Sequence, residues 1–220
     1  MSNELTSSSQ RVLDPASRVS EVVFGLIMVL TFTGSLSIAE ASREDIRTML
    51  IGALGCNLAW GIIDAVLYLM GRVAEKGRNL IVFQAVRRAN DPQVAQRLVA
   101  DALPPIVASI LEPTELEAIQ LRLKQLPEPP VRARLGKDDW LGGVGVFLLV
   151  VLSTFPVVIP FILMKSAVPA LRVSNSIAIA MLFMAGYAYG RFVGRHPWAL
   201  GIALVLLGCV LVGLTKALGG

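Results

Sequence analysis

Long apolar stretches constrain this chain more than any other feature. Five of them, at 22–39, 49–71, 140–164, 173–190 and 197–218, contain at most one charged residue each. A helix rises about 1.5 Å per residue and the hydrocarbon core of a bilayer is about 30 Å thick, so about 20 apolar residues suffice to cross it. The sequence therefore predicts an all-α membrane protein with five transmembrane helices.

The distribution of charge supports this prediction. Only 16% of the residues are charged and 55% are hydrophobic, whereas soluble domains carry about 25% charged residues. The net charge of +4 does not require nucleic acid as a partner, because basic residues also set the orientation of membrane helices. The polar start of the chain lacks the short apolar core and cleavage site of a signal peptide, so none is expected.

Counting lysine and arginine predicts the orientation. With the amino terminus in the cytoplasm, fifteen basic residues lie on the cytoplasmic side and five on the other, in accord with the positive-inside rule. We therefore expect an integral membrane protein with its carboxyl terminus outside. Four parts follow in order: a cytoplasmic tail (1–21), two helices (22–71), a cytoplasmic helical segment (72–139) and three helices (140–220).

The cytoplasmic segment has patterns of its own. An amphipathic helix is predicted from about Asp91 to Leu103, ended by two prolines. A second helix carries an apolar stripe at helical spacing, and Thr114 with Glu117 predicts a capping box at its start. The segment's acidic cluster offers candidate metal ligands, although a solvated helix face is the simpler interpretation because the spacing matches no ligand motif: Glu112, Glu115, Glu117 and Glu128.

Asp64 is the most informative single residue. It lies within the second predicted span, where an ionisable side chain costs about 2.5 kcal/mol or more, so we expect it to face a partner or water. Asn57 precedes it by seven residues and lies about 20° away around the helix, on a face shared with Ala53, Gly61 and Gly71. This face predicts a cation or proton site, with a helix–helix hydrogen bond as the structural alternative.

The third predicted span contains Pro156 and Pro160. Two prolines remove two backbone hydrogen bonds and kink a helix, and Ser153 and Thr154 are expected to satisfy some of the freed carbonyls. Kinked or broken helices line ion sites in transporters, but a packing kink is equally consistent with the pattern.

Other residues suggest packing or ligation. Gly186, Gly190 and Gly194 recur at four-residue spacing, which predicts close helix approach within the chain or across a dimer. Met28 offers a thioether ligand for a soft metal, although methionine in an apolar helix is usually a space filler. No zinc-protease motif, nucleophile elbow, phosphate loop or dinucleotide fingerprint is present, so an enzyme is not expected and no cofactor is predicted.

Two short stretches resemble the vacuolar iron transporter family. Residues 24–36 read Phe-Gly-Leu-Ile-Met-Val-Leu-Thr-Phe-Thr-Gly-Ser-Leu, and residues 55–61 read Gly-Cys-Asn-Leu-Ala-Trp-Gly. The layout of two helices, a cytoplasmic helical segment and three further helices is similar to the family's as well. The chain departs from the family where its Asn-Asp, Met and Glu residues would fall, on Ile27 and Met28, Leu58, and Ile62 respectively.

The resemblance implies a homodimeric transporter of a divalent metal cation, Fe²⁺ or Mn²⁺, with proton coupling as an option, in a bacterial inner membrane. It adds Ser35 and Met28 to Asp64 and Asn57 as candidate transport-pathway residues. Asp64 lies two positions beyond the family's missing glutamate and is interpreted as its replacement. The alternative is a non-transporting membrane protein whose cytoplasmic segment binds a partner or a lipid surface, near the basic pair Arg87 and Arg88.

Overall fold

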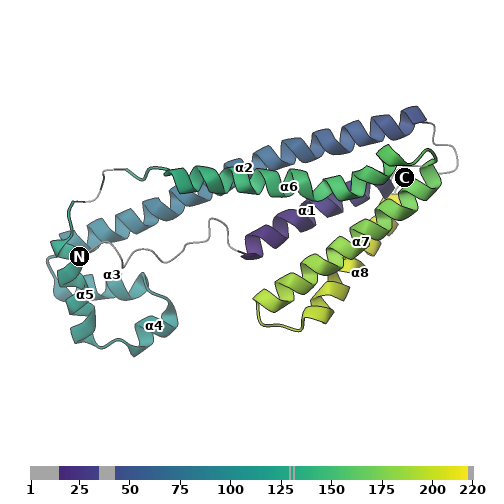
Figure 1. Cartoon of the computed structure of the whole chain (residues 1–220). Helices are drawn as coiled ribbons and strands as arrows, with labels where there is room; N and C mark the ends of the chain where they lie inside the picture. Colours follow the sequence, from purple (N-terminus) through teal and green to yellow (C-terminus); the bar gives the residue numbers. More distant parts are fainter. Residues whose placement is uncertain (1–14, 35–42, 129, 131, 218–220) are drawn as a thin grey trace, which may run out of the picture. The chain divides into compact units, whose positions relative to one another are not determined.

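The computed structural model describes residues 15–34, 43–128, 130 and 132–217, which form eight helices (Figure 1). Two compact units are present, one comprising Met1–Tyr68 with Asp138–Gly220 and the other Leu69–Lys137. The first unit contains α1 (Pro15–Gly34), the first part of α2 (Arg43–Arg88), α6 (Lys137–Leu163), α7 (Ala167–Phe192) and α8 (Pro197–Ala217). The second contains the rest of α2, α3 (Pro92–Asp101), α4 (Pro105–Ile110) and α5 (Pro113–Gln125).

The prediction of an all-α membrane protein is confirmed at the level of class. Four helices, α2, α6, α7 and α8, are long and apolar enough to cross a bilayer. The apolar part of α1 is shorter, Val19–Thr31, and the predicted first span at 22–39 runs past Gly34 into residues outside the described part. The count of five transmembrane helices therefore stays a prediction.

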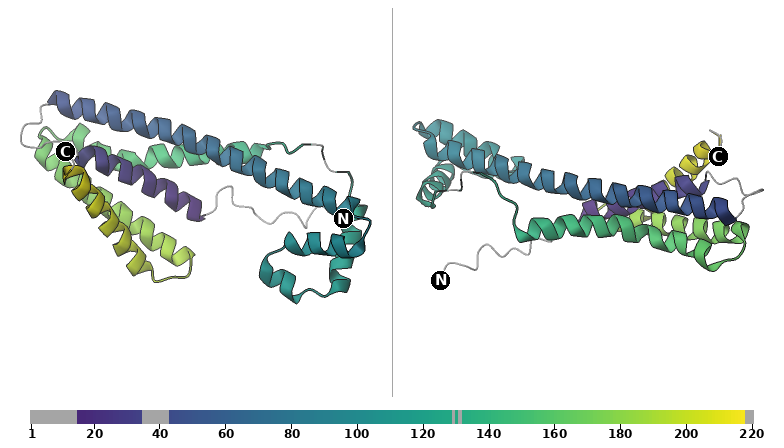
Figure 2. Two further views of the ribbon diagram at one scale, coloured as in Figure 1. Left: turned by 180° about the vertical axis from the view of Figure 1, so that it is seen from behind. Right: turned by 90° about the horizontal axis from the view of Figure 1, so that it is seen from above.

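The core of the first unit forms where α1, α6 and α7 meet. Its buried members are Leu26, Val29, Leu30, Val157, Val158, Ala178 and Leu182. The last two helices form a hairpin in which α7 and α8 lie side by side (Figure 2). This core packs α1 against α6 and α7.

Small residues let α7 and α8 approach closely, as their spacing predicted. A Cβ atom on Gly186 would lie 2.5 Å from the carbonyl oxygen of Leu200, and one on Gly190 would lie 2.6 Å from the Cα atom of Pro197. Gly194 differs, because it ends the helix with φ of 68° while the Arg195 amide donates to the Gly190 carbonyl, as in a Schellman motif. Two of the three glycines therefore pack helices within the chain, and the third makes the turn.

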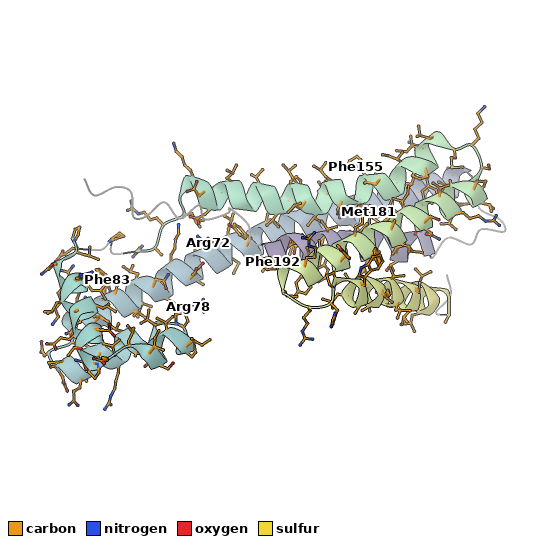
Figure 3. The ribbon with its side chains drawn as sticks, turned by 60° about the horizontal axis from the view of Figure 1, so that its bottom comes forward. Arg72, Arg78, Phe83, Phe155, Met181 and Phe192 are labelled. Carbon is orange, nitrogen blue, oxygen red and sulfur yellow. The ribbon has the colours of Figure 1, made fainter. Side chains whose placement is uncertain are left out.

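The second helix is longer than its membrane span. The stretch predicted to end at Gly71 belongs to a helix that continues to Arg88, along which Arg72 and Arg78 lie (Figure 3). A single glycine costs a helix only about 1 kcal/mol, and the Arg72–Glu75 ion pair one turn apart supports continuation. Where the membrane ends along this helix stays a prediction.

The second unit confirms the two short helices of the middle segment. Asp91 caps α3 by accepting a hydrogen bond of 2.9 Å from the Gln93 amide. The capping box predicted at Thr114 and Glu117 is wrong: Glu115 accepts from the Glu112 amide at 2.9 Å, because Pro113 is the first helical residue and Glu112 is therefore the cap. Arg87 donates to the Leu126 carbonyl at 2.6 Å and so ties α2 to the end of α5.

Candidate functional site

The predicted polar face of α2 packs against α6. Ala53 and Asn57 are each 1% exposed, and a Cβ atom on Gly61 would lie 3.2 Å from the Phe147 ring. These three residues are four apart, so they form one stripe along α2. Gly71, predicted on the same face, lies in open space, because a Cβ atom there would have no neighbour within 4 Å among the described residues. Close contact thus covers only the first three positions.

The amide of Asn57 bonds to α6 through its nitrogen. Nδ2 donates to the Thr154 hydroxyl at 2.8 Å, to the Val150 carbonyl at 3.2 Å and to the Val151 carbonyl at 3.4 Å. Its Oδ1 atom is buried and has no hydrogen-bond partner among the residues that the structure describes. Buried polar atoms are nearly always paired, so this oxygen is an open acceptor in the middle of an apolar unit.

The hydroxyl groups of Ser153 and Thr154 on α6 lie near this amide, but, contrary to the prediction, they do not satisfy the carbonyls freed by the prolines. Ser153 donates to the Val150 carbonyl and Thr154 to the Val151 carbonyl, both at 2.9 Å. The prolines free the carbonyls of Leu152 and Pro156 instead, so the expected compensation is wrong. A serine or threonine in a helix reaches back three or four residues, and these carbonyls lie outside that reach for Ser153 and Thr154.

The helix α6 itself remains helical through Pro156 and Pro160. Figure 3 shows this stretch of the ribbon, with Phe155 labelled next to the first proline. One turn further on, the Ser174 hydroxyl of α7 donates to the Val157 carbonyl at 2.6 Å. Side chains from α2, α6 and α7 thus reach the α6 backbone close to its prolines, where its internal hydrogen bonding is weakest.

The first helix, α1, also packs against this site. A Cβ atom on Gly25 would lie 2.6 Å from the Ser153 hydroxyl and 3.2 Å from the Val150 carbonyl oxygen. Only glycine permits so close an approach. We refer to Asn57, Ser153 and Thr154 as the amide–hydroxyl cluster, which is buried where α1, α2 and α6 meet.

A second polar site lies on α2 about 10 Å from the first, given seven residues of helix. The Asp64 side chain lies close enough to Glu21 of α1 for the two carboxyl groups to interact, while the Asp64 Oδ2 atom is buried and has no hydrogen-bond partner in the described part of the chain. Two neighbouring carboxyl groups repel each other when both are ionised, and either a proton or a cation relieves this repulsion. We refer to Glu21 and Asp64 as the carboxyl pair.

Glu21 is absent from the predicted site residues, because the predicted first span begins one residue after it. Two signals were available in the sequence. Glu21 adjoins the apolar stretch directly, and Met28 follows it by seven residues, which places both on one helical face. The partner of Asp64 still depends on how α1 and α2 align, and sequence periodicity does not report that alignment.

Within the part of the chain that the structure describes, no hydrogen bond or ion pair joins the remaining predicted site residues to these two sites. Met28 is half-buried in α1, and Ser35 lies outside the described residues. Glu115 is used in capping α5, while Glu112 and Glu117 are exposed. No group of three or more histidine, cysteine, aspartate or glutamate side chains converges into a metal site within the described ranges.

Comparison with known proteins identifies one family. The model of the VIT family matches residues 89–220, more than half of the chain. No curated protein matches. The match covers α3 to α8, whereas the stretches on which the sequence resemblance rests, 24–36 and 55–61, precede it. Both polar sites therefore include residues that lie outside the matched region, Glu21, Asn57 and Asp64.

Proposed function

Since the chain belongs to the VIT, or vacuolar iron transporter, family, which indicates a membrane transporter of metal ions, we propose that it moves a divalent metal cation, Mn²⁺ or Fe²⁺, through the carboxyl pair. The proposed transporter is a homodimer, as the sequence resemblance implies. Its amino terminus lies in the cytoplasm, as the distribution of basic residues predicts.

The carboxyl pair is the observation that supports this function best. Its two acidic side chains come from different helices, and one oxygen of Asp64 is buried and open. Two carboxylates carry the charge that neutralises one divalent cation, and oxygen donors suit hard cations such as Mn²⁺ better than soft ones. Fe²⁺, as the family's name suggests, is the second candidate.

Protons compete with a cation for this pair. Because two neighbouring carboxylates repel each other, a proton bound by the empty pair would be released when a divalent cation binds. Proton coupling would follow if the released proton left on the opposite side from the cation. The open Oδ1 of Asn57 is the next oxygen ligand along α2 for an ion that has lost part of its water shell.

Flux measurements with isosteric variants test the proposal. Full-length protein in liposomes should take up Mn²⁺ or Fe²⁺ and discriminate against Mg²⁺, which dehydrates reluctantly. In Asp64→Asn and in Glu21→Gln, uptake should fall roughly 100- to 1000-fold, since one unit charge at about 4 Å contributes up to about 4 kcal/mol at an effective dielectric constant of 20. Glu44→Gln, an exposed carboxyl on the same helix, is the matched control and should transport normally.

The amide variants retain hydrogen-bonding capacity but lose charge. If the pair only holds α1 to α2, both variants should transport at the wild-type rate. Uptake within twofold of wild type in either variant would therefore remove the carboxyl pair from the mechanism. A pH-sensitive dye inside the liposomes would report whether protons move against the metal.

A non-transporting role is the second candidate, and exposed apolar residues of the second unit favour it. In α4, Ile106 is 80% exposed and Ile110 is 73% exposed, which is typical of a surface that meets another molecule. Full-length protein that moves no cation from the panel, yet retains a partner through α4, would support this role. Loss of that partner in Ile106→Ser/Ile110→Ser would locate the contact.

A further inference from the structure

A groove of about 460 Å³ opens at one end of the first unit, where α2 begins and α6 ends. Its apolar wall comes from Leu50 and Leu54 of α2 and from Phe161 and Met164 at the end of α6. Phe161 is 8% exposed and packs with Ala170 and Leu171 of α7. The wall is therefore backed by the packed interior of the unit.

Two basic side chains stand at the rim of this groove, one on each wall. Arg47 belongs to α2, and Lys165 follows the end of α6. Arg47 comes two residues before the predicted span at 49–71, and Lys165 directly follows the predicted span at 140–164. The predicted spans therefore place both cations at the depth of lipid phosphates, where basic residues at helix ends place their charge.

Neither rim cation has an acidic partner in the ranges that the structure describes. The ion pair between Arg72 and Glu75 lies in the other unit. Glu44, in the first turn of α2, forms no salt bridge with Arg47. Within the described ranges, the rim therefore carries two positive charges without an ion-pair partner above an apolar groove.

We propose that this groove binds an anionic phospholipid, with the phosphate between Arg47 and Lys165 and an acyl chain along the wall formed by Leu50, Leu54 and Phe161. An arginine guanidinium bonds phosphate oxygens in a fork and a lysine ammonium adds a point charge. The acyl chain suits the wall because hydrocarbon needs no hydrogen-bond partner there. A peptide backbone in the same place would leave its polar groups unpaired.

Lipid titration of the full-length protein in detergent tests this site without any transport measurement. Native mass spectrometry and thermal unfolding would compare phosphatidylglycerol with phosphatidylcholine of the same acyl chains. Wild type should bind phosphatidylglycerol more tightly and gain more thermal stability from it. Each basic residue contributes about fivefold to binding of an anionic lipid, so Arg47→Gln/Lys165→Gln should lose about 30-fold of this preference.

Matched variants separate this groove from lipid contacts elsewhere. Arg97→Gln/Arg122→Gln removes the same charge from exposed positions of the second unit and should keep the preference. Ile51→Trp adds bulk inside the groove with both cations intact and should weaken binding. Ile62→Trp, at a similarly exposed position outside the groove, should not.

Three results would overturn the proposal. Equal binding of the two lipids by wild type would show that the rim charges recognise no anion. An unchanged preference in Arg47→Gln/Lys165→Gln would place the anionic lipid elsewhere. A thermal shift of the same size with glycerol phosphate, which has no acyl chain, would show that the groove takes a free phosphate and not a lipid.

Discussion

Replacing Asn57 by leucine separates the structural contribution of this residue from its contribution to ion movement. The side chain keeps a similar volume but loses the three contacts that Nδ2 makes with Thr154, Val150 and Val151. Hydrogen bonds between membrane helices contribute about 0.6 kcal/mol each and at most about 1.7 kcal/mol. The contact with Thr154 is the shortest, so we expect a total loss of about 1–2 kcal/mol.

The loss stays this small because the acceptors retain other partners. Val150 still accepts from the Ser153 hydroxyl, and Val151 from the Thr154 hydroxyl. Asn57→Asp should be worse, since a carboxylate oxygen would replace the donor next to two carbonyl oxygens, and a buried unpaired charge costs about 3–5 kcal/mol. The expected order of stability is wild type, then Asn57→Leu, then Asn57→Asp.

Thermal unfolding in detergent measures this order, and metal uptake in liposomes measures the second property. A loss of 1–2 kcal/mol lowers the midpoint by roughly 2–8 °C for a chain of this size. Asn175→Leu is the matched control, because this half-buried amide of α7 makes no hydrogen bond within the described ranges, and it should not lower the midpoint. An Asn57→Asp variant at least as stable as Asn57→Leu would refute the assignment of Nδ2 as donor.

Uptake then distinguishes the two interpretations of Asn57. A folded Asn57→Leu variant that transports at the wild-type rate would leave the residue a purely structural role. A folded variant with strongly reduced uptake would support Oδ1 as an oxygen ligand on the ion route.

Two further predictions concern the α7–α8 hairpin. Gly186→Ala should lower stability by about 1–3 kcal/mol through overpacking, since its Cβ would meet the Leu200 carbonyl at 2.5 Å. Gly213→Ala on α8, where a Cβ would have no described neighbour within 4 Å, should be neutral or stabilising. Equal unfolding midpoints for the two variants would contradict this packing. Gly194→Ala should cost about 1 kcal/mol because φ is 68° there, and Gly194→Asn, which tolerates this conformation better, should recover part of the loss in the same unfolding assay.

The membrane class, the short helices of the middle segment and the polar face of α2 could all be predicted from the amino-acid sequence. These features depend on runs of apolar residues, on proline positions and on a 3.6-residue period, all of which are local along the chain. Asn57 and Asp64 were identifiable for the same reason, because a polar or ionisable residue within an apolar helix is costly wherever its partners lie.

The groups that these residues contact follow from the packing of the helices and could not be predicted from the sequence. Glu21 becomes the partner of Asp64, and Thr154 the partner of Asn57, through the alignment of α1, α2 and α6. That alignment depends on shape complementarity between side chains distant in sequence, such as Gly25 against Ser153. A hydropathy average does not report such contacts, because it measures how apolar a helix face is and not which residues that face contacts.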